Sequence, residues 1–336
     1  MKKLKRIFAV FFCLLLASGI LGGCGKAASS SAPALSASQS GSKPLKIVTT
    51  IFPEYDWVRE ILGDKADYAE VTMLLDNGVD LHSYQPTADD IIKISDCDLF
   101  IYVGGESDGW VEDALKEAAN KDMRVINLLD VLGEQVKEEE VVEGMEAEEE
   151  ESEDEDEPEY DEHVWLSLKN AETLCNAITD ALEEIDPANK DAYAANAASY
   201  LEKLAALDGE YQTVVDNAAR KTVLFGDRFP FRYLVDDYGL SYYAAFAGCS
   251  AETEASFETI SFLAGKVDEL GLPCVLTIEG AQHKIAETIV QNSAAKNQSI
   301  LTLDSMQSTT SADAANGTTY LSVMESNLDV LKQALN

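Results

Sequence analysis

LKIVTTIFPEYDWVREILGDKADYAEVTMLL, residues 45–75, is the stretch that decides the expected fold of this chain. Residues 45–51 are apolar and β-branched, which is typical of a buried strand, and residues 69–75 repeat that character. Residues 55–62, between them, have the spacing of a helix. A strand, a helix and a second strand in about 30 residues predict a βαβ unit, whose two strands are parallel.

The same alternation continues along the chain in two groups. The first group adds two strands and three helices, which we expect at 88–95 (helix), 99–103 (strand), 110–120 (helix), 124–127 (strand) and 170–184 (helix). The second group has four strands with helices between them and a closing helix, which we expect at 222–225, 242–246, 274–278, 300–303 (strands) and 325–335 (helix). Strands that alternate with helices predict parallel sheets covered by helices.

A long helical stretch separates the two groups. It covers residues 187–219, and Pro187 stands in its first turn, where proline is tolerated. A helix of roughly 30 residues is about 45 Å long at 1.5 Å per residue, which is enough to join two lobes. We therefore expect an α/β fold of two lobes, residues 44–186 and 220–336, each with a mainly parallel sheet flanked by helices and joined by one long rigid helix.

The N-terminal residues are typical of an export signal. Residues 1–23 begin with basic side chains and continue with an apolar stretch, residues 7–16, that is too short to span a bilayer as a stable helix. Small residues before Cys24 resemble a bacterial lipoprotein signal, which implies cleavage before Cys24, a lipid on that cysteine and anchoring outside the cytoplasmic membrane. The alternative is an ordinary secretory signal in which Cys24 is incidental. The Ser- and Ala-rich residues 24–43 are expected to form a flexible tether.

The chain is strongly acidic. Its formal net charge is -36, and removal of residues 1–23, which hold four basic and no acidic residues, brings the charge to -40. Such a polyanion excludes nucleic acid as a partner, because phosphates are bound by Lys and Arg. Residues 138–162 form an acidic insertion with 17 carboxylates and no basic residue, and His163, one of three histidines, follows directly. The run is consistent with a divalent-metal site or with a disordered acidic loop that keeps the protein soluble.

Besides Cys24, the mature chain has four cysteines, at Cys97, Cys175, Cys249 and Cys274. An extracytoplasmic setting permits disulfides between them, but the sequence does not decide their pairing. No C-x-x-C pair is present, which argues against a thiolate zinc cluster or a thioredoxin-like site.

Metal-competent side chains follow strand ends in four segments. These are GVDLHSYQPT with His82, DEHVWLS with His163, FGDRFPFRY with Asp227, and LDS with Asp304. Ligands of open α/β sheets bind beyond the carboxyl ends of the strands. Two imidazoles with carboxylates are a donor set that zinc and manganese accept. Simpler roles stay open, since Asp304 suits a helix N-cap and Asp227 an ion pair with Arg228.

These motifs, with the sequence YGL at 238–240 and the long middle helix, resemble the solute-binding lipoproteins of bacterial ABC importers for zinc and manganese. The resemblance covers nearly the whole mature sequence and implies metal ligands at His82, His163 and Asp304. Zinc members of that family often have a loop rich in His and acidic residues before the second ligand. The long acidic loop here resembles that of zinc members, so Zn²⁺ is favoured; because it has no histidine, Mn²⁺ or Fe²⁺ stays an alternative.

One position departs from the family pattern. The family's third ligand, a His or Glu, lies ten residues before the Tyr of YGL, and Arg228 stands there. A guanidinium stays protonated and cannot ligate a cation. Three residues are candidates to replace it, namely Asp227, Glu279 and His283; a solvent-exposed place in the first turn of a helix is the alternative for His283.

The resemblance implies an extracytoplasmic, lipid-anchored substrate-binding protein. It would capture a divalent transition metal, Zn²⁺ before Mn²⁺ or Fe²⁺, in the cleft between the lobes and, as a monomer, deliver it to the membrane permease of an ABC importer. The acidic insertion would raise the local cation concentration as a mobile segment. Two rival classes are a secreted zinc hydrolase and a metal-stabilised adhesin. Against the hydrolase, the sequence has no H-E-x-x-H and no recognisable Ser/His/Asp order, so we expect no enzyme.

Overall fold

The computed structural model describes residues 43–146, 159–250, 254–280 and 283–336. Residues 43–336 form one compact unit. The predicted signal sequence, the lipidation residue Cys24 and nearly all of the tether lie outside the described residues, as does the middle of the acidic insertion, residues 147–158. None of the described helices is both long and apolar enough to cross a membrane.

The N-terminal strands form one parallel sheet, as the opening stretch predicts. Its strands stand in the order β2-β1-β3-β4. Their bounds are β1 Leu45–Thr49, β2 Ala69–Met73, β3 Leu99–Tyr102 and β4 Arg124–Asn127. The helix between β1 and β2 is α1, Phe52–Leu62, so the βαβ unit is confirmed.

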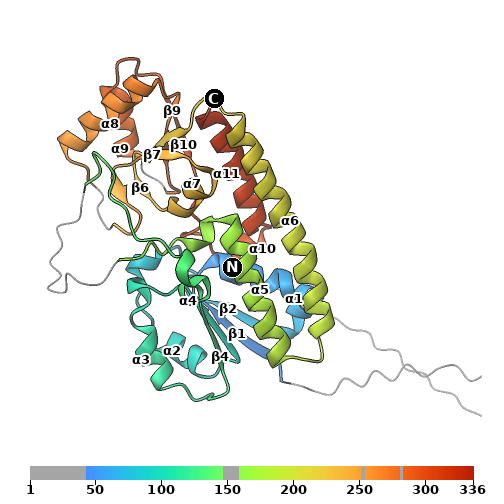
Figure 1. Cartoon of the computed structure of the whole chain (residues 1–336). Helices are drawn as coiled ribbons and strands as arrows, with labels where there is room; N and C mark the ends of the chain where they lie inside the picture. The colour runs from blue at the N-terminus through green and yellow to red at the C-terminus, as the bar shows by residue number, and fades with distance from the viewer. Residues whose placement is uncertain (1–42, 147–158, 251–253, 281–282) are drawn as a thin grey trace, which may run out of the picture. The chain divides into compact units, whose positions relative to one another are not determined.

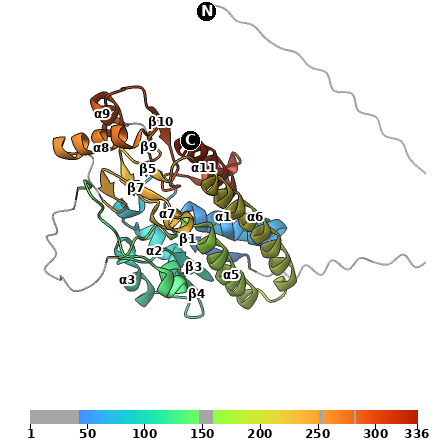
Figure 2. The same ribbon diagram turned by 45° about the horizontal axis from the view of Figure 1, so that its top comes forward.

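Helices cover both faces of this sheet. They are α2 Ala88–Ser95, α3 Val111–Lys116, α4 Leu128–Leu132 and α5 Leu168–Ile185. In Figure 1 and Figure 2, α2 and α3 lie on one side of the sheet, and α1 and α5 lie on the other with α6. Short 3₁₀ segments complete the lobe at Gly63–Tyr68, Leu81–Ser83, Glu106–Asp108, Gly133–Gln135 and Val164–Leu166.

The long middle helix is confirmed as α6, Lys190–Asp216, with 27 residues, but it begins later than predicted, so Pro187 lies in the turn before it and not in its first turn. It packs along α5 and α1 and continues beside α11 (Figure 1). Its inward stripe of tyrosines, Tyr193, Tyr200 and Tyr211, is almost fully buried. This helix therefore contacts elements from both halves of the chain.

The C-terminal strands form parallel pairs, β5 with β7, β6 with β8, and β9 with β10. Their bounds are β5 Thr222–Leu224, β6 Arg228–Phe229, β7 Ser241–Tyr243, β8 Phe246–Ala247, β9 Cys274–Thr277 and β10 Ser299–Thr302. An isolated parallel bridge between Phe225 and Leu276 joins the β5 and β9 pairs. The helices are α7 Arg232–Tyr238, α8 Phe257–Leu270, α9 Lys284–Asn292, α10 Ser311–Ala315 and α11 Tyr320–Ala334.

Three further elements differ from the predicted ones. The single strand expected at 242–246 is split into β7 and β8, because Ala245 donates its backbone N–H to Asp227 and the chain changes partner there. Helix α3 is shorter than expected. Helix α11 begins five residues earlier than predicted, since Thr319 accepts a bond from the Ser322 backbone and caps its first turn.

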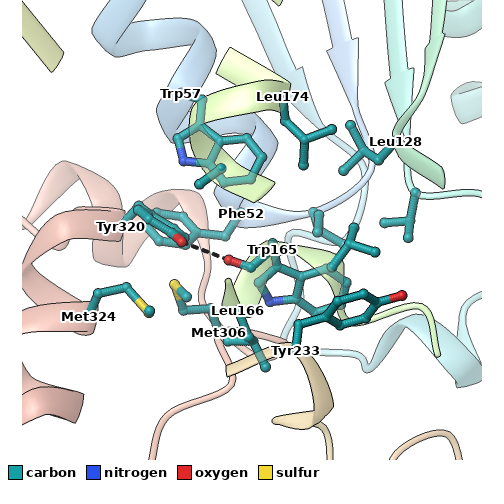
Figure 3. Packing of buried hydrophobic residues seen from close by; sticks show 14 of the residues in the cluster. Phe52, Trp57, Leu128, Trp165, Leu166, Leu174, Tyr233, Met306, Tyr320 and Met324 are labelled. Atoms are coloured by element: carbon teal, nitrogen blue, oxygen red, sulfur yellow. Dashed lines mark hydrogen bonds between the residues drawn. The ribbon is translucent and has the colours of Figure 1, made fainter. Parts of the chain in front are cut away.

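One large apolar cluster runs through both lobes and holds the unit together. Tyr320 of α11 donates its hydroxyl to the Trp165 carbonyl at 2.7 Å, and Trp165 donates its indole N–H to the Ser305 carbonyl at 2.9 Å. Figure 3 shows Trp57, Phe52 and Tyr320 packed around this contact. A smaller cluster fills the space between α8, α9 and β9. The α/β fold with parallel sheets, flanking helices and one long helix is confirmed, and the continuous packing of its two halves favours small rather than wide movements.

Candidate metal centre

His82 lies in the loop that follows β2, in the 3₁₀ segment Leu81–Ser83. The Asp80 carboxylate accepts the His82 backbone N–H at 3.0 Å and caps this turn. Leu81 is buried in the core and anchors the loop. The local sequence therefore holds the His82 ring at the carboxyl edge of the N-terminal sheet, with only 11% of its side chain exposed.

His163 follows the acidic insertion and is fully buried. Asp161 fixes its orientation, because one carboxylate oxygen accepts both the His163 backbone N–H at 2.8 Å and the ring Nδ1–H at 2.9 Å. On another side, a Cβ at Gly248 would lie 3.1 Å from two atoms of the His163 ring and 2.9 Å from the Phe229 carbonyl oxygen. Only a glycine at position 248 leaves that space free.

The two imidazoles meet tip to tip. Their Nε2 atoms are 3.2 Å apart, while His82 Nδ1 lies 2.8 Å from the Ser107 hydroxyl and His163 Nδ1 lies against Asp161. The Asp161 carboxylate only accepts and so holds the proton of a neutral His163 ring on Nδ1, and the Ser107 hydroxyl can accept an Nδ1–H from a neutral His82 ring in the same way. Two Nε2 lone pairs then face each other. A tetrahedral zinc with Zn–N bonds of about 2.0–2.1 Å separates its nitrogen ligands by about 3.3 Å, close to the spacing of these atoms.

Cys249 is the third metal-competent residue at this point. A ring nitrogen of each histidine and the Cys249 Sγ atom all lie within 4.8 Å of one another. Within residues 43–146, 159–250, 254–280 and 283–336, no other set of three His, Cys, Asp or Glu side chains satisfies that criterion. The four described cysteines are all free thiols. Sequence reasoning considered Cys249 only for disulfide pairing and missed its place in the fold.

Carboxylates surround the cluster. A cavity of about 300 Å³ opens beside it, and it is lined by His82, Glu106, Ser107, Glu139, Glu159, Tyr160, Glu162 and Cys249. Glu162 accepts the Ser107 backbone N–H at 2.9 Å through Oε1, whereas its buried Oε2 has no hydrogen-bond partner among the described residues. That Oε2 atom lies 3.5 Å from His82 Nδ1.

The described ends of the acidic insertion are built into the protein. Glu138 and Tyr160 form an antiparallel bridge, and Glu139 accepts the Cys249 backbone N–H at 3.0 Å. Glu140 accepts a bond from the Tyr242 hydroxyl at 3.2 Å. These ends are therefore not the mobile segment that we expected. The middle of the insertion, residues 147–158, lies outside the described residues.

Burial and charge act in opposite directions on the two histidines. Burial, together with the neighbouring His163 and Arg228, lowers the pKa of His82 to about 3 against the opposing effect of Asp80. For His163, burial disfavours the charged ring, but contact with Asp161 holds its pKa above the ordinary value. Burial raises the pKa of the Cys249 thiol and of the Glu162 and Glu139 carboxyls. Desolvated donors of this kind favour a bound cation, which supplies the missing positive charge.

Arg228, at the position where a ligand was expected from the family pattern, makes an ion pair instead. Its guanidinium donates to Asp80 Oδ2 at 2.6 Å and to the Ser250 carbonyl at 3.3 Å. It thereby links the His82 loop to the Cys249 segment. Because a guanidinium has no lone pair for a metal, its contribution is to position the two segments.

Comparison with known families decides which family this fold belongs to. A family model described as the zinc-uptake complex component A, periplasmic, abbreviated ZnuA, matches residues 47–334. The chain belongs to the ZnuA family. A component of an uptake complex is a transport protein, so this membership agrees with the expectation that the chain is not an enzyme.

Curated relatives carry the same description. The chain is 32% identical over 337 residues to the high-affinity zinc uptake system protein ZnuA of Bacillus subtilis, covering 99% of this chain and 98% of that protein. It is 33% identical over 290 residues to the zinc-binding lipoprotein AdcA of Streptococcus pneumoniae, covering 86% of this chain. Because that match covers 55% of AdcA, the chain spans about half the length of this relative.

Solved structures of ZnuA-like proteins have the same fold. The Zn(II)-bound ZnuA-like domain of Streptococcus pneumoniae AdcA matches with a TM-score of 0.67 and 30% identity, covering 87% of this chain and 99% of that one. The metal-dependent lipoprotein YcdH from Bacillus subtilis matches with a TM-score of 0.69 and 28% identity, covering 87% and 99% of the two chains.

The remaining predicted residues of this ZnuA-family chain have other neighbours. Asp304 accepts the Met306 backbone N–H at 2.7 Å, and burial and the nearby Glu279 raise its pKa to about 6. Asp304 makes no interaction with either histidine among the described residues. Asp227 accepts the Arg228 backbone N–H at 2.9 Å.

Glu279 and His283 also lie outside the histidine pair. The Glu279 carboxylate accepts three bonds, from the Ser305 backbone and hydroxyl, both at 2.7 Å, and from the Gln307 backbone at 3.0 Å. His283 stands at the N-cap of α9, and its buried Nδ1 atom has no hydrogen-bond partner in the part of the chain that the structure describes. Among the described residues, the structure thus brings His82 and His163 together, while Asp304, Asp227, Glu279 and His283 do not join them in a cluster that could hold a metal ion.

Proposed function

We propose that this chain is the substrate-binding component of an ABC importer and captures Zn²⁺ through His82 and His163. Zinc is the cargo, held between the two lobes and passed to a membrane permease. The zinc-uptake description of the family and the zinc-binding relatives support this assignment.

One observation carries the proposal. The two Nε2 atoms face each other at 3.2 Å, while each Nδ1 atom has its own partner, Ser107 or Asp161. Metal-ligating histidines commonly donate their second ring N–H to a carboxylate or another oxygen, which fixes the tautomer that can ligate. Two neutral imidazoles held in this way are prepared for a cation and make a poor pair without one.

We propose Asp304 as the carboxylate ligand from the C-terminal lobe. It follows β10, and the adjacent segment reaches the His82 loop through Gln307, whose amide, turned to face Asp80, donates to both carboxylate oxygens at 3.1 and 3.2 Å. A small local movement on metal binding would bring Asp304 to the imidazoles. Asp227, Glu279 and His283 support the surrounding loops in this proposal, since the two carboxylates already accept backbone hydrogen bonds.

The setting of this function is also a proposal. The sequence before residue 43 supports export, cleavage before Cys24 and a lipid on that cysteine, which would hold the protein at the outer side of the cytoplasmic membrane. One zinc site within one chain needs no second copy, so the protein would act as a monomer. Changing Cys24 to Ala should release the protein from the membrane fraction in its native host.

Equilibrium zinc binding tests the proposed function. The full-length protein, stripped with chelator, is titrated with Zn²⁺ against a chromophoric chelator of known affinity. We expect one tight site that His82→Ala and His163→Ala each weaken by more than 100-fold, above the ~10–100-fold typical of a lost outer partner. Mn²⁺ and Fe²⁺ should compete poorly. Zinc binding that survives both substitutions would refute the proposal, and preference for Mn²⁺ would replace zinc as the cargo.

A further inference from the structure

The proposed ligands His82, His163 and Asp304 supply two imidazoles and one carboxylate, which leaves a four-coordinate zinc site one ligand short. Arg228 stands at the position where the family pattern has that ligand, and its guanidinium donates to the Asp80 carboxylate instead. We propose that the Sγ atom of Cys249 is the missing zinc ligand, so that His82, His163 and Cys249 form a His₂Cys donor set. This inference rests on the proposed function and specifies the chemistry of its site.

The distances allow this donor set with little movement. Sγ and the ring nitrogens of both histidines lie within 4.8 Å of one another. With Zn–S near 2.3 Å and Zn–N near 2.0–2.1 Å, a tetrahedral site separates sulfur from nitrogen by about 3.6 Å. A shift of roughly 1 Å by the Cys249 segment closes that difference.

The backbone around Cys249 is held against the cluster on three sides. The Cys249 N–H donates to Glu139 at 3.0 Å, and the next carbonyl, at Ser250, accepts from Arg228 at 3.3 Å. On the preceding side, Gly248 packs so closely on the His163 ring that a side chain would lie 3.1 Å from it. The arrangement brings the thiol to the imidazoles and holds it there by neighbours that are not themselves ligands.

A second observation points to a cation at this place. The Glu162 side chain is 3% exposed, its Oε2 atom has no hydrogen-bond partner, and that atom lies 3.5 Å from His82. An unpaired carboxylate oxygen is costly to bury. Positive charge from a zinc ion bound at the neighbouring imidazole and thiolate compensates it.

The chemistry of the step is a simple exchange. The S–H bond of Cys249 breaks, a Zn–S bond forms, and the proton passes to solvent, with no change in oxidation state. A thiolate is a soft ligand and selects zinc over manganese or magnesium, which prefer oxygen donors. Cys249 is also the one described cysteine that is partly exposed, whereas Cys97, Cys175 and Cys274 are buried.

Cobalt substitution tests the thiolate directly. The full-length protein is loaded with Co²⁺, and the near-ultraviolet spectrum is searched for a thiolate-to-cobalt charge-transfer band. We expect the band in the wild type and in Cys274→Ala, the matched control, and its loss in Cys249→Ser. Zinc affinity should fall more than about 10-fold in Cys249→Ser and stay unchanged in the control, as expected for a ligand rather than a distant thiol.

A second measurement avoids reliance on a folded variant. Wild-type protein is alkylated with iodoacetamide with and without Zn²⁺, and the peptides are mapped by mass spectrometry. Zinc should protect the Cys249 peptide. If the wild type binds zinc through His82 but shows no charge-transfer band and no protection of Cys249, the thiolate ligand is refuted while the proposed function stands. If the wild type binds no zinc at all, the proposed function itself fails.

Discussion

Replacing Asp161 by Asn should weaken zinc binding without removing a zinc ligand. Asp161 is 2% exposed, and a single oxygen accepts both the backbone N–H and the Nδ1–H of His163, at 2.8 and 2.9 Å. Asn keeps an acceptor of the same shape but loses the charge. The His163 ring then donates less electron density through Nε2 and loses the fixed tautomer.

The magnitude follows from the hydrogen bond that is weakened. A hydrogen bond to a charged group contributes about 1.5–3 kcal/mol. Loss of an outer partner of a ligating histidine costs about 10–100-fold in metal affinity, which is about 1.4–2.7 kcal/mol. The two estimates agree, so we expect the zinc dissociation constant of Asp161→Asn to rise by about 10–100-fold.

The assay is competition with a chromophoric chelator at pH 7.5, with folding checked by circular dichroism. Asp237→Asn is the control, because Asp237 accepts the Ser167 hydroxyl at 2.6 Å and makes no contact with either histidine. Zinc affinity in Asp161→Asn equal to that of the wild type, in a folded protein, would refute the role given to Asp161 and the tautomer assigned to His163.

Four further changes test other parts of the account. Asp304→Asn should lower zinc affinity by more than about 10-fold if Asp304 is the carboxylate ligand; an unchanged titration would remove it from the site. Trp165→Phe should lower the free energy of unfolding by about 1–3 kcal/mol in urea titrations, because the Ser305 carbonyl loses its 2.9 Å donor; no loss would show that the bond contributes little. Burial raises the pKa of Glu54 to about 8, so its stabilising effect is complete below the unfolded value of about 4.3 and is lost as pH rises through 8. The zinc-free protein should therefore be less stable at pH 8 than at pH 6, and Glu54→Gln should reduce that difference; an equal difference in both proteins would contradict the assignment. Deleting residues 147–158 should slow zinc association at low ionic strength and leave the dissociation constant unchanged in stopped-flow and equilibrium titrations, whereas a large affinity loss would give those carboxylates a direct role.

Much of the fold could be predicted because its strands are short apolar runs and its helices have clear periodicity. The stretch 45–75 contains the βαβ unit that the structure has, and the long helix follows from its even spacing of buried residues. The split of residues 242–246 between two sheets could not be predicted. It depends on a bond between Ala245 and the distant Asp227 carbonyl, and local sequence contains no sign of that partner.

The candidate site, too, could be predicted only in part. His82 and His163 could be found because each stands in a distinctive motif, His82 in the loop after β2 and His163 at the end of the acidic insertion, and the structure places their Nε2 atoms 3.2 Å apart. Cys249 could not, since its thiol reaches the histidines only through the packing of Gly248 and the bonds from Glu139 and Arg228. The sequence pointed to Cys249 only indirectly, because Arg228 at the family's third ligand position implies that another residue supplies the missing metal ligand.

The most direct test of the central claim is a crystal structure of the zinc-loaded protein with anomalous data on both sides of the zinc absorption edge. The account predicts one strong anomalous peak, within about 2.0–2.1 Å of the Nε2 atoms of His82 and His163, with the Cys249 sulfur at about 2.3 Å. A zinc peak elsewhere, with the two imidazoles still facing each other and no metal between them, would contradict it.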